Sequence, residues 1–379
     1  MPKKRILLIT RNLPPLVGGM ERLNWHMADE LSKHSELRVI GPKGAAALKP
    51  DNVVVTEAPL KPLTLFLLVA FLKSLWQILR WKPDVVLAGS GLTAPLAWLG
   101  SKMCGARSAA YLHGFDITVQ NRLYQRLWSP TFKKLDVVVV NSTPTKNLAR
   151  AAGVPEARIS IVHPGVSIPD APQPEEALAA FKQQHGLQGK KILLSVGRLT
   201  TRKGLCEFVE HALPKIVELA PSAMLVVIGE APKNALGAGI QSVESILEQA
   251  KKSGVAEHLC LLGVITDRTM LATAYEAADV HVFPVRHIPD DPEGFGMVAI
   301  EAAAHGLPTV AYSTGGIVDA VAEGQSGYLV PPGDYPALAE GAVRLLTDSS
   351  SILRTSSRNF AAQFAWPILG AKIRQALRL

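Results

Sequence analysis

Two glutamates in a glycine-rich segment form the strongest chemical signal of the sequence. Glu293 and Glu301 are separated by seven residues that read GFGMVAI. Glycines before an apolar run predict a helix that begins near residue 295, whose first backbone N–H groups are free to hold phosphate oxygens. The residues of this predicted phosphate-binding turn are Gly294, Phe295, Gly296 and Met297.

The spacing of the two carboxylates suits a nucleotide with a sugar attached. Glu301 lies five residues beyond Gly296, which is about 7–8 Å along a helix axis. That distance matches the span from a diphosphate to a ribose, whose hydroxyls a carboxylate can accept. Glu293 precedes the helix and points toward whatever the far phosphate carries. It could therefore hold sugar hydroxyls.

Two cations bracket a turn elsewhere in the second half of the chain. Arg198 and Lys203 lie in the segment SVGRLTTRKG, residues 195–204, directly after a predicted strand. Two fixed cations would neutralise a diphosphate, and more so as its charge grows when a bond to it breaks. The alternative interpretation is a solvated basic turn.

A glycine pair near the N-terminus gives a weaker signal. Gly18 and Gly19 lie in the segment PPLVGGME, between a predicted strand and a predicted helix. Backbone N–H groups at such a turn can approach a phosphate, and the helix N-terminus adds partial positive charge. No Gly-Lys-Ser/Thr follows, so the turn is not a P-loop, and an ordinary βα turn remains the alternative.

Short apolar runs alternate with helical patterns and predict an α/β fold of two doubly wound parallel sheets. We predict a first domain over 1–166, a Pro- and Gly-rich linker over 167–189 and a second domain over 190–364. Such sheets bind ligands at the carboxyl ends of their strands, so a cleft between the domains is the expected site. The predicted strands are 5–10, 37–40, 53–56, 84–88, 109–113, 136–141 and 158–163, then 192–196, 224–228, 259–262, 280–283, 309–312 and 327–330.

Composition supports a folded chain of two domains with unequal charge. The chain has 379 residues, 48% of them hydrophobic and 19% charged, which excludes a disordered protein. Residues 1–166 carry a net charge of +12 and residues 167–379 a net charge of −4. The two halves should therefore meet different partners. The three cysteines show no CxxC spacing and are expected to be reduced thiols: Cys104, Cys206 and Cys260.

An apolar stretch over 62–79 lies in the basic half, flanked by Lys61, Arg80 and Lys82. Its nearly continuous apolar character favours a buried helix that packs on the sheet. Lys73 interrupts it, which disfavours a transmembrane span. The N-terminal apolar run is too short for a signal peptide. We expect a cytoplasmic protein that associates peripherally with an anionic membrane surface through its first domain and has no nucleic-acid partner.

The chain resembles family 4 of the retaining glycosyltransferases, which adopt the GT-B fold of two facing Rossmann-like domains. The resemblance extends over nearly the whole chain and implies that the C-terminal helix, over 365–379, crosses back to the first domain. The first domain would take the acceptor and the second the donor. The motifs that carry it are the PPLVGG loop, HGFD at 113–116, GRLTTRKG, the Glu-x7-Glu segment and FAW at 364–366.

The resemblance also implies roles for individual residues. Arg198 and Lys203, with Arg202 nearby, match the residues that bind the donor diphosphate. Glu293 matches the residue on the donor sugar and Glu301 the one on the ribose. The remaining matches are Val264, in the backbone strip 263–265 that reads the nucleobase; His113, beside the donor sugar; and Gly19, an N–H donor to the leaving phosphate. Glu293, His113, Arg198 and Lys203 form the expected catalytic set.

The activity implied by the resemblance is transfer of a hexose, with retention, from a UDP- or GDP-linked sugar to an acceptor hydroxyl. The acceptor would be a carbohydrate or a lipid-linked or phosphorylated molecule, in cell-envelope glycan, lipopolysaccharide or glycolipid synthesis. No Asp-x-Asp motif is present, and neither a metal nor another cofactor is expected. The alternatives are a sugar-nucleotide epimerase, a phosphorylase that would need pyridoxal phosphate and a longer chain, and an inactive binding module.

Overall fold

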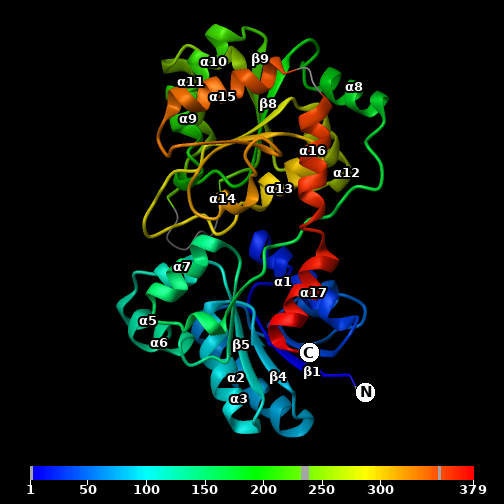
Figure 1. The fold of residues 1–379 in the computed structure, drawn as a ribbon, viewed down its shortest axis with the longest axis vertical. Coiled ribbons are helices and arrows are strands. Elements are labelled where there is room, and N and C mark those ends of the chain that lie inside the picture. The colour runs from blue at the N-terminus through cyan, green and yellow to red at the C-terminus, as the bar shows by residue number, and fades with distance from the viewer. Residues whose placement is uncertain (1–2, 232–238, 349–350) are drawn as a thin grey trace. The chain divides into compact units, whose positions relative to one another are not determined.

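The computed structural model describes residues 3–231, 239–348 and 351–379, which form two compact units (Figure 1). Unit 1 comprises Met1–Gly165 and Phe364–Leu379, and unit 2 comprises Val166–Gln363. The segment 167–189, predicted as a linker, belongs to unit 2. Its helix α8 (Glu175–Gln184) contributes Phe181 to a buried cluster of that unit, because an apolar residue on a short lead-in helix gains free energy by packing.

Unit 1 is built on a seven-stranded parallel sheet of order β3-β2-β1-β4-β5-β6-β7. Most of its central strands are buried on both faces, as the continuous apolar runs predict. The order reverses between β1 and β4, which are neighbours in the sheet. The strands are β1 (Arg5–Ile9), β2 (Glu36–Pro42), β3 (Val54–Ala58), β4 (Val85–Ala88), β5 (Arg107–Leu112), β6 (Val137–Val140) and β7 (Ile159–Ile161).

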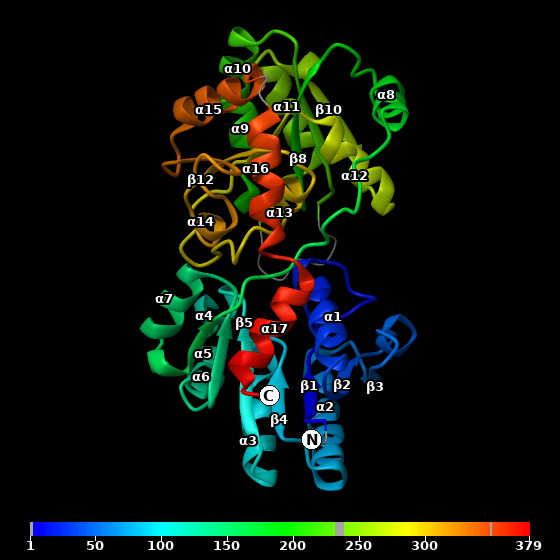
Figure 2. The same ribbon diagram turned by 45° about the vertical axis from the view of Figure 1, so that its right-hand side comes forward.

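The helices of unit 1 include the C-terminal helix, which returns to this unit as predicted (Figure 2). In α17 the Trp366 ring stacks on His26 of α1 with centroids 3.9 Å apart, and Arg107 donates to the Leu377 carbonyl at 2.6 Å. The helices are α1 (Gly19–Ser32), α2 (Leu63–Trp81), α3 (Ala94–Cys104), α4 (Phe115–Thr118), α5 (Arg122–Leu127), α6 (Ser129–Phe132), α7 (Thr143–Ala151) and α17 (Trp366–Leu377), with 3₁₀ turns η1 (Ala45–Leu48), η2 (Gly91–Thr93) and η3 (Glu156–Arg158).

Helix α2 differs from the prediction of a simply buried helix. Phe66, Ala70 and Ile78 are fully buried against the sheet, whereas Leu68 and Leu72 are more than half exposed. A helix that lies on a sheet can bury only one stripe of its surface, so apolar residues all round it leave the opposite stripe in solvent. By length and composition alone α2 could cross a membrane.

Unit 2 repeats the architecture with a six-stranded parallel sheet of order β10-β9-β8-β11-β12-β13. A buried cluster covers each face: Leu193 of β8 belongs to one, and its neighbours Ile192 and Leu194 to the other. The order reverses between β8 and β11. The strands are β8 (Lys191–Val196), β9 (Ala223–Ile228), β10 (Leu259–Gly263), β11 (Val280–Phe283), β12 (Thr309–Tyr312) and β13 (Gly327–Val330).

The helices of unit 2 cover both faces of its sheet (Figure 1). Helix α16 packs on α13 within this unit. They are α8, α9 (Leu205–His211), α10 (Leu213–Leu219), α11 (Val243–Lys252), α12 (Arg268–Ala277), α13 (Met297–Ala304), α14 (Ile317–Ala320), α15 (Tyr335–Thr347) and α16 (Ser351–Ala362), with 3₁₀ turns η4 (Thr201–Lys203) and η5 (Ala256–His258).

Candidate active site

The predicted cations and glutamates of unit 2 meet where the order of its strands reverses. The loop after β8 carries Arg198, Arg202 and Lys203, and the loop after β11 leads to Glu293. Strands β8 and β11 are parallel neighbours, so both loops emerge at the carboxyl edge of the sheet. This point of a doubly wound sheet leaves a crevice that favours ligand binding.

Three of the predicted residues form one ionic cluster. Glu293 Oε2 accepts from Lys203 Nζ at 2.9 Å and lies 3.1 Å from Arg202 Nη1. Arg202 also pairs with Asp291 at 3.3 Å and donates to the Pro292 carbonyl at 3.0 Å. The side chains of Glu293, Arg202 and Lys203 are only 12–18% exposed. The cluster is therefore rigidly held and shielded from solvent.

The charges around Glu293 keep it ionised. Burial by itself raises the pKa of Glu293, but the charges of Arg202 and Lys203 outweigh burial and lower the pKa to about 2. Arg198 is exposed, and its charge adds to the same shift. The Lys203 ammonium also lies 4.6 Å from the centroid of the Phe283 ring, which adds a cation–π contact.

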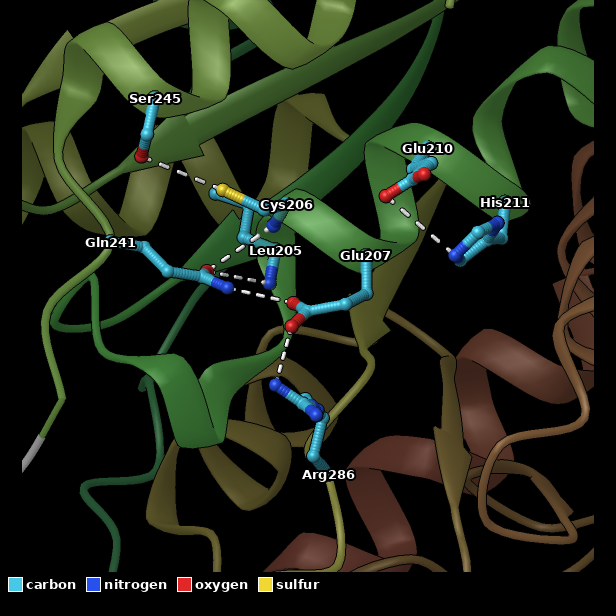
Figure 3. A network of polar contacts seen from close by, with 8 residues as sticks. All are labelled: Leu205, Cys206, Glu207, Glu210, His211, Gln241, Ser245 and Arg286. Atoms are coloured by element: carbon cyan, nitrogen blue, oxygen red, sulfur yellow. Dashed lines mark hydrogen bonds and ion pairs between the residues drawn. The ribbon is translucent and has the colours of Figure 1, made fainter.

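A polar network fixes the turn that carries Arg202 and Lys203 (Figure 3). Gln241 accepts from the N–H groups of Leu205 and Cys206 at the start of α9 and donates to Glu207 at 2.7 Å. Glu207 in turn pairs with Arg286, from the loop after β11. The Arg286 N–H donates to the Arg202 carbonyl at 2.8 Å. The network thus ties the two loops of the ionic cluster together.

Gly204 allows these two loops to approach each other closely. Its φ of +68° lies in the left-handed region, and a Cβ at this position would collide with the Pro284 carbonyl. Any larger residue would push the turn with Lys203 away from the loop after β11. Gly204, the last glycine of the GRLTTRKG segment, therefore has a packing role.

The glycine-rich turn before α13 starts its helix later than predicted. Helix α13 begins at Met297, and Gly296 has a left-handed φ of +90°, where a helix near 295 was expected. Gly296 packs against the Phe283 ring and Phe295 is buried, so tertiary packing displaces the start by two residues. The Glu293 carbonyl accepts from the Gly316 N–H at 2.8 Å, which fixes the backbone before the turn at Gly294.

Glu301 and Val264 lie on other parts of the same edge of unit 2. Glu301 is partly buried in α13 and accepts from the Tyr275 hydroxyl of α12 at 3.2 Å. Tyr275 stacks on His305, which is 2.9 Å from Glu276. Val264 follows the end of β10 and is exposed. The contacts of the ionic cluster include neither residue.

In unit 1 the predicted His113 follows β5 and is anchored by two neighbouring loops. Its Nε2 lies 2.9 Å from the Gly89 carbonyl, its N–H donates to Asp116, and its carbonyl accepts from Asn141. Because a carbonyl only accepts, Nε2 carries a proton and the neutral ring has Nδ1 as its acceptor. The Gly89 carbonyl also accepts from buried Asn24.

Gly18 and Gly19 lie at the N-terminus of α1, as the βα turn predicts. Helix α1 begins at Gly19, and Gly18 is extended. The Glu21 carboxylate packs against Gly18 and accepts from Asn12 at 2.8 Å. The turn is therefore braced by a side chain from the end of β1, and a carboxylate is part of it.

Several residues of these sites gave no signal in the sequence analysis. His281 on β11 is fully buried beneath the cluster, and burial, with the charge of Lys203, lowers its pKa to about 3. A neutral imidazole is thereby kept under a cationic site. Gln241, Arg286 and Glu207 are distant in sequence, so only their tertiary contacts identify them.

A hollow in unit 1 contains none of the predicted site residues. It is formed at the amino ends of the strands, next to α17, and includes Lys4, Asp84, Arg107 and Arg158. Among residues 3–231, 239–348 and 351–379, no group of three or more His, Cys, Asp or Glu side chains is arranged to hold a metal ion. Asp291 pairs with Arg202.

Comparison with known families covers both units of the chain. A family model described as Glycosyl transferases group 1 matches residues 179–363, and one described as Glycosyltransferase Family 4 matches residues 17–168. The chain belongs to the group 1, family 4 glycosyltransferases of the GT-B fold. This membership confirms the resemblance drawn from the motifs and favours a glycosyltransferase over the epimerase alternative.

Individual relatives of this glycosyltransferase align over different lengths. A GDP-mannose-dependent alpha-(1-6)-phosphatidylinositol monomannoside mannosyltransferase of Mycolicibacterium smegmatis is 28% identical over 98% of both chains. A D-inositol 3-phosphate glycosyltransferase of Catenulispora acidiphila is 32% identical over 59% of this chain and 51% of its own. The structure of Anabaena HepE in complex with UDP has a TM-score of 0.81 at 19% identity and 99% coverage of both chains. It shows that the fold is shared.

Proposed function

We propose that this glycosyltransferase moves a hexose, with retention of configuration, from a nucleoside-diphosphate sugar to an acceptor hydroxyl. The observation that carries the proposal is the cluster of Arg202, Lys203 and Glu293 at the carboxyl edge of unit 2, with Arg198 beside it. Fixed cations there suit a diphosphate, and an ionised carboxylate suits sugar hydroxyls.

The donor we propose to test first is GDP-mannose. The M. smegmatis relative, similar over nearly its whole length, is GDP-mannose-dependent. HepE has been solved with UDP-glucose, which is the second donor to test. Release of nucleoside diphosphate together with labelled sugar in the acceptor would support the proposal. Isomerisation of the nucleotide-sugar without acceptor would instead indicate an epimerase.

The proposed reaction breaks the bond between the anomeric carbon and the β-phosphate oxygen and forms a bond from that carbon to the acceptor oxygen. The acceptor proton passes to the leaving diphosphate, on the same face of the sugar. Arg198, Arg202 and Lys203 stabilise the charge that grows on the diphosphate. Glu293 accepts hydrogen bonds from the sugar hydroxyls. No protein nucleophile is needed in this scheme.

Replacing Glu301 by glutamine should separate nucleotide binding from sugar transfer. If its carboxylate accepts from the ribose hydroxyls, the variant loses a charge-assisted hydrogen bond and binds bare nucleoside diphosphate about 10-fold more weakly. Calorimetric titration with GDP and UDP measures this. The Tyr275→Phe variant, which removes only the hydroxyl that donates to Glu301, is the control for changes in Glu301 orientation. Unchanged affinity in Glu301→Gln would refute the ribose role.

Activity should persist without divalent ions. In the proposed scheme the cationic side chains neutralise the diphosphate, so no metal is needed for that purpose. Initial rates of sugar transfer after extensive dialysis against EDTA should match the untreated rates within about twofold. Complete loss of activity, restored by Mg²⁺ or Mn²⁺, would contradict this prediction.

We further propose that the acceptor is a lipid-linked or phosphorylated molecule at the cytoplasmic face of a membrane, in cell-envelope glycan or glycolipid synthesis. Unit 1 holds 25 Lys and Arg against 10 Asp and Glu, a net charge of +15. Such a charge favours anionic surfaces and anionic acceptors. The name of the M. smegmatis relative specifies a phosphatidylinositol monomannoside acceptor, which supports the same class.

A further inference from the structure

We propose that the exposed face of α2 lies flat on an anionic phospholipid surface and anchors unit 1 there. The proposal rests on the membrane-presented acceptor proposed above and names the element that docks. It is carried by an apolar stripe in solvent, by cations around that stripe and by a buried opposite face. The docking face is defined as Leu65, Leu68, Leu72, Trp76 and Leu79.

The docking face is continuous along the helix. Its residues recur at three- and four-residue spacing from Leu65 to Leu79 of α2, which is about 21 Å of helix. Leu68, Leu72 and Trp76 are 51–56% exposed. Keeping this much aliphatic and aromatic surface in water is unfavourable, and contiguous apolar patches of this kind typically mark interaction sites.

The charged residues of the segment 61–82, which contains α2, are all basic. Residues 61–82 contain Lys61, Lys73, Arg80 and Lys82 and no Asp or Glu. The Arg80 guanidinium lies 4.9 Å from the Trp76 ring centroid, so it borders the docking face. An exposed apolar stripe bordered by Lys and Arg can immerse at the boundary between headgroups and acyl chains, as the apolar face of an interfacial helix does, while the other side of α2 is covered by the sheet.

The neighbouring helix α3 extends the same chemistry. Gly100 of α3 packs directly against Ile78 of α2, so the two helices lie side by side, as both ribbon views show (Figures 1 and 2). Leu99 and Met103 of α3 are exposed, and Lys102 between them is its one charged residue. Exposed apolar side chains and a cation therefore occur on both helices.

Other occupants of the docking face fit less well than an anionic bilayer. A two-fold dimer through α2 would bring together two copies of the segment 61–82, each with four cations and no acidic residue. A transmembrane arrangement would expose the opposite face, on which Ser74 and Gln77 are buried and Gln77 accepts from Arg38 at 2.6 Å. Lipid contact along one stripe leaves these interactions of unit 1 intact.

The test compares Leu68→Ser/Leu72→Ser with a matched pair on another helix of unit 1. Leu123 and Leu127 of α5 have the same four-residue spacing and are 63% and 53% exposed, against 56% and 55% for Leu68 and Leu72. We expect the full chain to sediment with phosphatidylglycerol-containing vesicles at low salt. Binding should be at least about 10-fold weaker for Leu68→Ser/Leu72→Ser and unchanged for Leu123→Ser/Leu127→Ser.

Two further measurements make the outcome decisive. The vesicle-induced blue shift of tryptophan emission should be absent in Trp76→Phe. Raising salt to 0.5 M, where the Debye length is about 4 Å, should weaken wild-type binding steeply. Equal binding to neutral and anionic vesicles, equal losses in the two double variants, or a wild-type dimer that Leu68→Ser/Leu72→Ser dissociates would each overturn the proposal.

The same variants separate this inference from the proposed transferase. Leu68→Ser/Leu72→Ser changes unit 1, whereas the ionic cluster belongs to unit 2, so the variant should bind GDP-mannose and UDP-glucose as the wild type does. If no nucleotide-sugar binds either protein, the proposed donor chemistry fails while vesicle binding remains a separate result. If donors bind and vesicles do not, the docking face is refuted and the donor site stands.

Discussion

Alanine in place of Lys203 should lower kcat/KM for sugar transfer by about 10- to 150-fold. The change removes a charge-assisted contact worth about 1.5–3 kcal/mol, and each 1.4 kcal/mol is tenfold. Negative charge on the diphosphate grows in the transition state, so the loss should appear in kcat more than in binding. Steady-state kinetics with varied donor, at saturating acceptor, measure both parameters.

The control for Lys203→Ala is Lys215→Ala. Lys215 lies in α10 of the same unit, is half exposed and pairs with Glu218 at 3.0 Å. Its removal should leave kinetics unchanged, since exposed pairs contribute little. Because Lys203 also balances the charge of Glu293, thermal unfolding of Lys203→Ala should be recorded alongside. Wild-type kcat and KM in this variant would show that Lys203 does not bind the diphosphate.

Glutamine in place of Glu293 should reduce kcat by about 100-fold while leaving the affinity for bare nucleoside diphosphate nearly unchanged. The carboxylate is ionised because its pKa is lowered to about 2, so it can stabilise the positive charge that develops on the sugar. Glutamine keeps the size and the hydrogen bonds but removes the charge. Single-turnover rates, with GDP and UDP titrations, separate the two effects.

The pH dependence of stability gives an independent measure of the same carboxylate. In the folded protein the pKa of Glu293 lies below its ordinary value of 4.5. Its contribution to the free energy of unfolding is therefore complete above about pH 4.5 and is lost as pH falls through about 2. Urea unfolding between pH 5 and 2 should therefore show a smaller loss of free energy in Glu293→Gln. The control is Asp291→Asn, which removes a carboxylate that lies 3.3 Å from Arg202. A wild-type kcat in Glu293→Gln would contradict the sugar role.

The strands could be predicted from sequence because they are buried on both faces. The predicted strands 280–283 and 309–312 coincide with β11 and β12, residue for residue. Helix ends were less predictable: α13 starts at Met297 because Gly296 packs on Phe283, a contact absent from any local window.

The ionic cluster could be predicted in part. The motif spacing placed Lys203 and Glu293 at one edge of the sheet, where they are 2.9 Å apart. It favoured Arg198 as the second cation of the pair, but the structure gives the contact to Arg202 and leaves Arg198 exposed. Which side of a 3₁₀ turn faces the carboxylate depends on how the turn packs, here through Gly204 and Arg286.

The buried supports of the site could not be predicted from single residues. His281 lies in a buried strand, and a lone histidine there does not reveal which other residues lie beside it in the fold. The exposed stripe of α2 was missed for a related reason. The residues of α2 are apolar on nearly every side, so the sequence pattern shows no polar face that would mark the side in contact with solvent.

Equilibrium titration of GDP-mannose and UDP-glucose into the full chain, without divalent ions, tests the central claim most directly. We expect saturable binding of at least one donor to the wild type, weaker binding to Lys203→Ala, and unchanged binding to Lys215→Ala. Absence of binding by either donor, or equal affinity in the wild type and Lys203→Ala, would contradict the claim that the cationic cluster of unit 2 holds the donor diphosphate.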